Sequence, residues 1–239
     1  MSKRIINLLE NKKLPQIKDT LKKMPSADIA EIIDEMDSKN SLLLFRLLPK
    51  NEAAEVFSHL SSDKKEELSV LVREDELEAI IDDLDFDDMI DYLEEMPANV
   101  VRKILKNTSE VERKLINQFL NYPDDSAGSL MTIEYVSLKA EMTVEEALEH
   151  IRKIALDKET IYTCFVTSSD RRMQGIISLK DLILASRDKK VKEIMTKNFI
   201  WVNTHDDQEY IASLFKKYDF FSMPVVDYEN RLVGIITID

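Results

Sequence analysis

Apolar residues recur every 12 positions through the first half of this sequence, and this repeat restricts the possible folds more than any other feature. Each unit holds two apolar anchors, the second eight positions after the first. The first anchors are Met24, Met36, Leu48, Leu60, Val72, Leu84, Met96 and Leu120, with Thr108 interrupting the run. The second anchors are Ile32, Leu44, Val56, Leu68, Ile80, Tyr92, Ile104 and Ile116. The pattern predicts one short helix and one tight turn in each unit.

Helices this short need neighbours, because a helix of about 8 residues is not stable alone in water. Stacked units can bury their anchors against each other, as in solenoid proteins. Pro or Ser follows the first anchor in most units, and Pro suits the first turn of a helix because its missing N–H costs little there. These residues are Pro25, Pro49, Ser61, Pro97 and Ser109. We expect a right-handed superhelical solenoid of short helices over about residues 5–120.

The charge of the chain limits its partners. The 239 residues carry a net charge of −13, and residues 1–128 hold 28 acidic against 18 basic side chains, a net of −10. Such a chain repels nucleic acid and anionic lipid and attracts cations. No apolar run approaches the roughly 20 residues that span a bilayer, the N-terminus lacks a signal-peptide core, and the single cysteine, Cys164, fits a reducing compartment. We therefore expect no nucleic-acid partner and a cytoplasmic location.

Residues 74–95 carry 12 acidic side chains and no basic one. Asp87 and Asp91 lie four positions apart, so they share a helix face and repel unless a cation neutralises them. One interpretation is a solvated acidic face. The other is a divalent site that forms when another surface closes over this face, and oxygen ligands then point to Mg²⁺ or Ca²⁺. No EF-hand spacing is present, so Ca²⁺ is not specifically indicated.

The second half contains the same pattern twice. Leu130-Met131-Thr132 recurs as Ile194-Met195-Thr196, an offset of 64. In the first copy we predict strand Tyr135–Leu138, helix Val144–Arg152 opened by the Thr143/Glu146 capping box, strands Tyr162–Thr167 and Gly175–Ser178, and helix Leu179–Ala185. In the second we predict strand Phe199–Val202, helix Gln208–Lys217 capped by Asp207, and strands Ser222–Asp227 and Gly234–Thr237. The second copy stops at Asp239, where its closing helix should start, so we expect the natural chain to continue.

Two copies of strand–helix–strand–strand–helix, the first closed by Gly175-Ile-Ile-Ser178-x-x-Asp181, resemble a pair of CBS domains. The string Leu120 to Thr132, LNYPDDSAGSLMT, resembles the junction at which the helical N domain of MgtE-type magnesium channels enters its CBS pair. Further matching strings are Leu47–Lys50, Ala53–Val56, Glu159–Tyr162, Asp207–Glu209 and Lys217–Phe220. The resemblance covers essentially the whole chain. It implies an N domain at residues 1–128, a first CBS domain at 129–188 and a second at 189–239 that lacks its C-terminal helix.

The resemblance implies a function as well as a fold. MgtE-type channels are membrane homodimers that pass Mg²⁺ into the cytoplasm, and their cytosolic part senses internal Mg²⁺. Mg²⁺ that bridges acidic surfaces of the N domain and the CBS pair holds the pore shut, and at low Mg²⁺ the domains separate. This chain would then lie at the cytoplasmic face of the cell membrane, form a homodimer through the CBS pair, and precede a membrane pore domain. Carried over by position, the metal ligands are Glu55, Asp87, Asp91, Asp207, Glu209 and Asp219.

Several of these residues also have plain structural interpretations. Asp207 can act as a helix N-cap, and Asp219 can simply end a helix. The resemblance also implies ATP or AMP in the CBS cleft, where Ser178 and Asp181 would hold ribose or phosphate and Phe220 and Pro224 would line the cleft. Ser178 and Asp181 equally fit another capping box. Lys180 stands where the family often has Arg, and Thr163 where an aromatic residue is common.

The sequence contains no catalytic constellation: no Gly-x-Ser-x-Gly, no P-loop and no Cys–His arrangement. We therefore expect a regulatory module and not an enzyme. Phe199 and Trp201 are interpreted as core or dimer packing. Two alternatives stay open beside Mg²⁺ sensing. One is a CBS module that senses adenine nucleotides, with the acidic face only solubilising, and the other is a solenoid scaffold that binds a basic partner protein.

Overall fold

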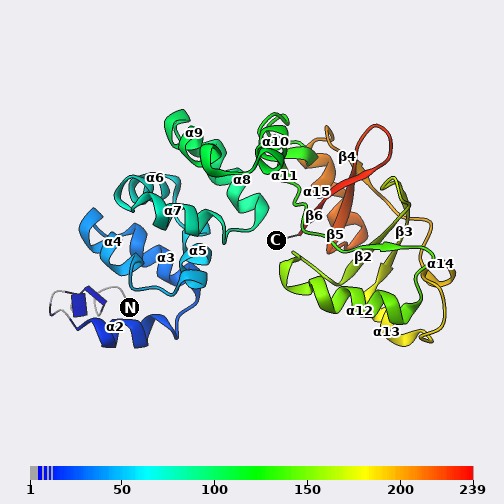
Figure 1. Cartoon of the computed structure of the whole chain (residues 1–239), viewed down its shortest axis with the longest axis horizontal. Coiled ribbons are helices and arrows are strands. Elements are labelled where there is room, and N and C mark those ends of the chain that lie inside the picture. The colour runs from blue at the N-terminus through cyan, green and yellow to red at the C-terminus, as the bar shows by residue number, and fades with distance from the viewer. Residues whose placement is uncertain (1–4, 7, 10, 12, 239) are drawn as a thin grey trace. The chain divides into compact units, whose positions relative to one another are not determined.

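The computed structural model describes residues 5–238 except residues 7, 10 and 12 (Figure 1). Residues 1–4, at the expected start of the first domain, and Asp239 lie outside the described residues. The chain divides into two compact units, Met1–Arg113 and Lys114–Asp239, and the division falls inside helix α10 (Glu110–Phe119). The expected domain limits at residues 128 and 188 stay predictions.

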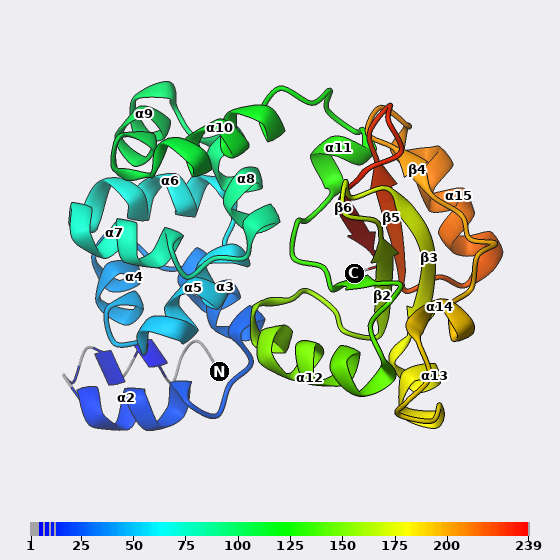
Figure 2. The same ribbon diagram turned by 45° about the vertical axis from the view of Figure 1, so that its right-hand side comes forward.

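The helices of the first unit begin at intervals of 12 residues, which confirms the repeat. Helix starts fall at Leu14, Ser26, Ser38, Lys50, Ser62, Glu74, Phe86, Ala98 and Glu110. The helices are α2 (Leu14–Leu21), α3 (Ser26–Asp34), α4 (Ser38–Phe45), α5 (Lys50–Ser58), α6 (Ser62–Leu71), α7 (Glu74–Ile81), α8 (Phe86–Glu95), α9 (Ala98–Asn107) and α10. Figure 2 shows these short helices stacked on one another within the unit.

Three of the prolines lie just before a helix and not in its first turn, where they were predicted. Pro25, Pro49 and Pro97 are N-cap residues with extended backbone, at ψ of 147°, 155° and 142°. The predicted position in the first turn was therefore wrong by one residue. Proline is still favourable at the N-cap, because its fixed φ near −60° suits the entry of the chain into a helix.

The second anchors form the core of the first unit. Every one from Ile32 to Tyr92 is buried and Ile104 is half-buried, and Ile116, which belongs to the second unit, is buried as well. Helices two units apart pack on one another, so that α3, α5 and α7 form one row and α4, α6 and α8 another, and α4 also packs on α3. The rows are pinned by polar contacts, among them a buried 2.7 Å hydrogen bond between the hydroxyls of Ser69 and Tyr92.

The second unit contains two three-stranded sheets, which confirms the duplicated pattern. In each, the first strand runs parallel to the second and the second antiparallel to the third. The first copy comprises α11 (Ala127–Leu130), β1 (Ser137–Lys139), α12 (Val144–Ile154), η1 (Ala155–Asp157), β2 (Thr163–Thr167), β3 (Met173–Ser178) and α13 (Leu179–Leu184). The second comprises α14 (Val191–Ile194), β4 (Val202–Asn203), α15 (Gln208–Tyr218), β5 (Ser222–Val226) and β6 (Leu232–Thr237).

The two copies exchange their leading segments. Thr132, which precedes the first sheet, pairs with Ile235 of β6, and Thr196, which precedes the second sheet, pairs with Ile176 of β3. Phe165, Leu232 and Ile235 form a buried cluster that joins the two sheets. The copies therefore form one interlocked body, although each contributes its own sheet.

One predicted strand is mostly absent. The expected strand Phe199–Val202 is observed only as Val202–Asn203. Trp201 is 46% exposed and contacts Phe199, with ring centroids 5.6 Å apart, so a core position for Trp201 was wrong. No helix among the described residues combines the length and the apolar character that crossing a membrane requires.

Candidate functional site

Three carboxylates of the acidic run 74–95 are neutralised by basic residues. Arg46 contacts Glu76 at 3.0 Å, Lys50 contacts Asp83 at 3.1 Å, and Arg73 contacts Asp75 at 2.6 Å. The first two ion pairs join α4 and α5 to α7 and to the turn that follows it. Part of the run therefore forms exposed ion pairs with other units of the repeat, and such pairs contribute little to stability.

The aspartates of α8 and of its N-cap are different. In the part of the chain that the structure describes, Asp85, Asp87, Asp88 and Asp91 form no ion pair. Burial raises the pKa of Asp85, Asp87 and Asp91 above the usual aspartate value, and the charge of Asp88 raises each of these pKa values further. Folding thus holds together four carboxylates that repel one another.

Glu55 of α5 belongs to the same electrostatic environment. Its charge contributes to the raised pKa of Asp85, so the two carboxylates are close enough to interact. We call Glu55, Asp85, Asp87, Asp88 and Asp91 the acidic patch. Of the three metal-ligand candidates predicted in the first unit, Asp87 and Asp91 share α8, and Glu55 interacts with Asp85 at the start of that helix.

The acidic patch contains a buried oxygen without a hydrogen-bond donor among the described residues. This atom is Oδ1 of Asp87. The same holds for Oε2 of Glu52, which lies three residues before Glu55 on α5. A buried carboxylate oxygen without a donor is costly, and such an atom is often explained by an ion or water.

The candidates of the second unit lie at the two ends of α15. Asp207 is the N-cap, and its Oδ1 accepts a 2.8 Å hydrogen bond from the backbone N–H of Glu209. Asp219 follows the last residue of the helix with φ of 52°, a left-handed conformation that aspartate tolerates. The plain structural roles predicted for these two aspartates are therefore present. Asp207, Glu209 and Asp219 are all exposed.

The segment before α11 pairs with the start of α15. Asp125 O accepts from the backbone N–H of Gln208 at 2.8 Å, and Ala127 N–H donates to Asp206 O at 2.8 Å. Ser126 and Asp207 form a β-bridge. This places further carboxylates, those of Asp124, Asp125 and Asp206, on segments that adjoin Asp207.

Each unit, taken by itself, offers carboxylate oxygens but only a partial set of ligands for a metal ion. The described residues contain no group of three or more His, Cys, Asp or Glu side chains placed to hold a metal ion by themselves. Mg²⁺ is commonly bound through one or two carboxylates while it keeps several waters. The unpartnered oxygen of Asp87 and the purely oxygen donor set of α8 fit Mg²⁺ held in this form.

The four residues predicted to bind a nucleotide have structural roles of their own. Ser178 is the N-cap of α13: its Oγ accepts from Asp181 N–H at 3.0 Å and donates to Asp181 Oδ2 at 2.6 Å. Phe220 is half-buried and stacks on Tyr218, with ring centroids 5.4 Å apart. Pro224 is buried in β5. The structure brings Ser178 and Asp181 into contact as a helix cap.

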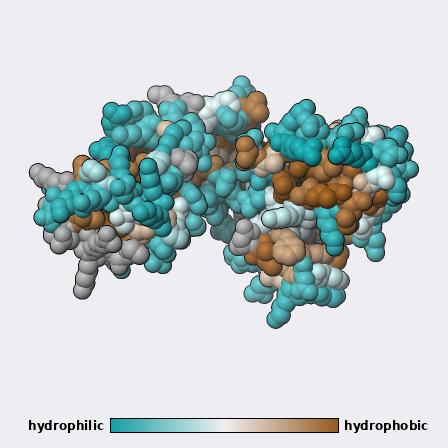
Figure 3. Space-filling model, turned by 90° about the horizontal axis from the view of Figure 1, so that it is seen from below, coloured by the Kyte–Doolittle hydropathy of each residue, from teal (hydrophilic) through white to brown (hydrophobic). Residues whose placement is uncertain are grey.

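A cavity of about 400 Å³ lies between α12 and α13 and includes none of these four residues. Its walls are mostly apolar, with Ile151, Leu182 and Ile183 among them, and Arg152 and Arg187 also line it. Figure 3 shows apolar atoms gathered on one face of the second unit. Two exposed apolar side chains of α13 are Ile183 and Leu184.

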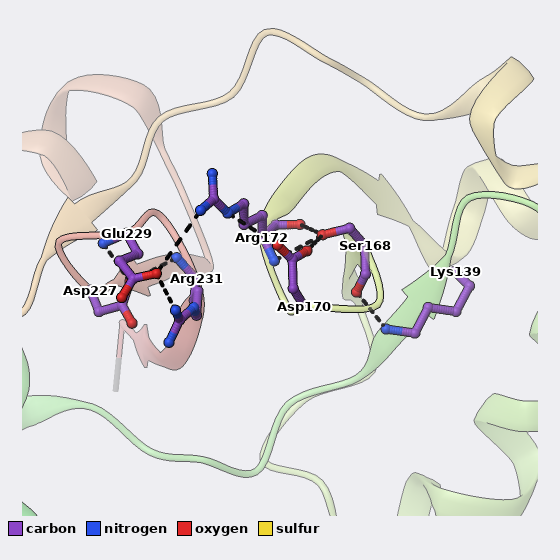
Figure 4. A network of polar contacts seen from close by, with 7 residues as sticks. All are labelled: Lys139, Ser168, Asp170, Arg172, Asp227, Glu229 and Arg231. Carbon is purple, nitrogen blue, oxygen red and sulfur yellow. Dashed lines mark hydrogen bonds and ion pairs between the residues drawn. The ribbon is translucent and has the colours of Figure 1, made fainter.

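Arg172, Arg231 and Lys139 of the second unit each contact groups of the same unit. The β2–β3 turn and the β5–β6 turn meet, and Arg172 contacts Asp170 at 3.1 Å and Glu229 at 4.0 Å (Figure 4). Arg231 also pairs with Glu229, and Lys139 donates to Ser168 O at 2.9 Å. These three basic side chains are therefore engaged within the second unit.

Sequence reasoning did not single out Glu52, Asp85 or Asp88. Both aspartates lie in the acidic run, but their importance depends on how burial and mutual distance raise pKa values, which the one-dimensional pattern does not contain. Glu52 lies outside the run, and only the packing around α5 reveals its buried oxygen.

Comparisons with known proteins agree with this architecture. The MgtE intracellular N domain model matches residues 24–125, and the CBS domain model matches residues 127–188 and 191–239. Magnesium transporter MgtE of Thermus thermophilus is 39% identical over 228 residues, 93% of this chain and 50% of that protein. Magnesium transporter MgtE of Bacillus subtilis is 31% identical over 238 residues, 99% and 52% respectively. The chain thus spans about half the length of these curated relatives.

Solved structures show the same fold. The crystal structure of the cytosolic domain of the Mg²⁺ channel MgtE in complex with ATP matches with a TM-score of 0.93 at 35% identity, covering 100% of this chain and 98% of that one. The soluble part of a magnesium transporter matches with a TM-score of 0.89 at 28% identity, covering 100% and 94%. The predicted order of a helical solenoid and a CBS pair is confirmed, and the chain belongs to the MgtE family of magnesium transporters.

Proposed function

We propose that this chain is the cytosolic Mg²⁺-sensing region of a Mg²⁺ transporter or channel. In this proposal, Mg²⁺ bound to the acidic patch and to the second CBS domain favours the closed pore. The proposed ligands are Glu55, Asp87, Asp91, Asp207, Glu209 and Asp219. The chain acts by regulation and carries out no catalysis.

The observation that carries the proposal is the set of unpaired aspartates on α8. Their mutual repulsion makes the ion-free patch electrostatically unfavourable, and a divalent cation relieves it. A cation that binds one arrangement of the two units better than another stabilises that arrangement by mass action. The net charge of −13 adds a general repulsion that the same cations reduce.

Calorimetric titration with MgCl₂ at constant ionic strength tests the proposal. We expect saturable binding by the wild-type chain and loss of most of that binding in the Asp87→Asn/Asp91→Asn double variant. The matched control is Asp75→Asn, which removes a carboxylate of the same acidic run that Arg73 already neutralises, and it should bind Mg²⁺ as the wild type does.

The alternatives predict other outcomes. A wild-type chain without saturable Mg²⁺ binding would contradict the proposal and favour the interpretation of the acidic face as a solvated or partner-binding surface. Equal loss of binding in the control and in the double variant would mean that total charge, and not the acidic patch, attracts the ion.

We place the membrane pore outside these 239 residues, because the curated relatives are about twice as long. The regulatory region would then lie at the cytoplasmic face of the cell membrane.

We also propose a homodimer through the CBS pair, with the apolar side chains of Ile183 and Leu184 covered by the second copy. Ile183→Glu/Leu184→Glu should then convert a dimer into a monomer in light scattering, and a wild-type chain that is monomeric at high concentration would contradict this.

A second candidate function is the sensing of ATP or AMP by the CBS pair, which is favoured by the ATP complex of a structurally similar MgtE domain. Ser178, Asp181, Phe220 and Pro224 are the proposed contacts. Calorimetry with ATP and AMP tests it, with Asp181→Asn as the variant that should weaken binding. Binding that is absent, or that Asp181→Asn leaves unchanged, would remove this set of contacts.

A further inference from the structure

The packing of the 12-residue repeat weakens at the turn between α9 and α10. Thr108 is a polar residue at a position where the other units carry an apolar first anchor. The second anchor of the same unit, Ile104, is half-buried, whereas the other second anchors are buried. Val111, in the first turn of α10, is 78% exposed. A segment with few buried apolar contacts is where a folded chain opens or bends most easily.

The side-chain hydrogen bonds of this turn are local. Thr108 Oγ1 donates to Leu105 O at 3.0 Å. Ser109 caps the start of α10, because its hydroxyl accepts from Glu112 N–H at 3.2 Å and its N–H donates to Glu112 Oε2 at 3.0 Å. Arg113 donates from its guanidinium to Thr108 O at 3.1 Å. None of these bonds reaches beyond residues 105–113, so they hold the two helix ends in shape without fixing the turn to more distant parts of the chain.

The other end of α10 is packed firmly within the second unit. Phe119 is buried and meets the ring of Tyr122 edge-on, with centroids 5.7 Å apart. The ring of Tyr122 in turn meets that of His205, in the loop between β4 and α15, at 6.2 Å. A Cβ added to Gly128 would lie 2.5 Å from the Tyr122 ring, so only glycine leaves room for it. Tyr122 therefore connects the end of α10 to the second CBS copy.

Backbone hydrogen bonds fix the segment between α10 and α11 as well. Asp125 O accepts from Gln208 N–H, and Gly128 N–H donates to Thr204 O, both at 2.8 Å. Helix α10 contains neither Pro nor Gly, which are common causes of a kink. The helix should therefore move as one body, and the division of the chain places most of it in the second unit. Movement between the units is then left to the N-terminal end of α10.

We propose that the turn at Thr108 and Ser109 is the pivot about which the two units move, and that α10 moves with the second unit. The matching N domain model extends to residue 125, so this pivot lies inside that domain and not at its border with the CBS pair. The pivot separates the acidic patch on the first unit from Asp207, Glu209 and Asp219 on the second. The inference does not depend on Mg²⁺ binding, because it is tested without the ion.

Distances between spin labels on the whole chain, measured by double electron–electron resonance without Mg²⁺, test the pivot. Both label pairs use exposed positions and a Cys164→Ala background. The first pair joins Asn117→Cys on α10 to Ser213→Cys on α15. The second pair joins Asn117→Cys to Lys39→Cys on α4. We expect a narrow distance distribution for the first pair and a broad one for the second. A broad first pair or a narrow second pair would overturn the proposal.

Two variants make the result specific. Tyr122→Ala removes the ring contacts at the end of α10, so the first pair should lose its narrow distribution. Tyr162→Ala, at a residue that is 71% exposed, is the matched control and should leave it narrow. Thr108→Leu restores the apolar anchor and should narrow the distribution of the second pair.

Circular dichroism melts confirm that the compared variants are folded, and His205→Ala repeats the measurement on the first pair if Tyr122→Ala does not fold. Distributions that neither the loss of these ring contacts nor Thr108→Leu changes would overturn the assignment of the pivot to this turn.

Discussion

Thr132 and Ile235 exchange two backbone hydrogen bonds of 2.9 Å each, although they lie at opposite ends of the CBS pair in the sequence. Thr196 and Ile176 do the same at 2.8 and 3.0 Å. The segment that precedes each sheet therefore pairs with the last strand of the other sheet. The stability of one copy should depend on the other, and unfolding of the pair should be cooperative.

Gly234 is the position at which this exchange is most easily broken. A Cβ added there would lie 2.8 Å from Thr132 O and 2.6 Å from Met131 Sδ. Gly234→Ala should lower the free energy of unfolding of the second unit by about 1–3 kcal/mol, because the backbone of Thr132 must move. Urea unfolding followed by fluorescence of Trp201, the single tryptophan of the chain, measures it. Ser213→Ala, at an exposed site on α15, is the control, and equal unfolding midpoints for the two variants would contradict the close contact.

Tyr92→Phe should lower the free energy of unfolding of the first unit by about 1 kcal/mol, the usual net value of one buried hydrogen bond. The change removes the bond to Ser69 and leaves the ring packed on Phe57, whose centroid lies 5.2 Å away. Thermal unfolding followed by circular dichroism gives the difference. Val70→Ala, at a residue of α6 that is 73% exposed, should be nearly neutral, and a loss as large as that of Tyr92→Phe would show that α6 is sensitive at every position.

The acidic patch predicts a particular dependence on pH. In the folded chain, burial and the charge of Asp88 raise the pKa of Asp85, Asp87 and Asp91 above the aspartate value of 3.8. The folded state thus binds protons more readily than the unfolded chain. The contribution of these groups to stability therefore falls as the pH rises through the range in which the aspartates lose their protons. The repulsion without Mg²⁺ is therefore larger at pH 7 than at acidic pH.

Asp88→Asn should therefore raise the free energy of unfolding at pH 7 by up to about 1 kcal/mol, a value limited by solvent screening of the partly exposed groups. The gain should disappear below about pH 3, where aspartates are protonated. Urea unfolding at both pH values tests this, with Asp19→Asn, exposed on α2, as the matched removal of one charge. An equal gain from both variants would show that net charge alone is responsible.

The elements most accessible from sequence were those set by local chemistry. The 12-residue spacing fixed where helices begin, since each start from Ser26 to Glu110 follows the pattern of anchors. The Thr143/Glu146 capping box and the Asp207 cap are both observed, because a cap depends only on residues within one turn. Helices α12 and α15 merely continue past their predicted ends, to Ile154 and Tyr218.

Features that depend on distant packing were not predictable. The exchange of Thr132 and Thr196 between sheets requires the two copies to be interlocked, and the exposure of Trp201 follows from where β4 begins. Asp87 and Asp91 could be named from their spacing, whereas Asp88 could not. Its effect on the neighbouring aspartates depends on burial, which the spacing does not contain.

Small-angle scattering of the wild-type chain, with and without millimolar Mg²⁺ at matched ionic strength, tests the central claim most directly. Matching the ionic strength separates ion binding from general screening. The account predicts that Mg²⁺ lowers the radius of gyration of the wild-type chain and leaves that of Asp87→Asn/Asp91→Asn unchanged. A radius of gyration that Mg²⁺ does not change in the wild type, or that it lowers equally in both proteins, would contradict Mg²⁺ sensing by the acidic patch.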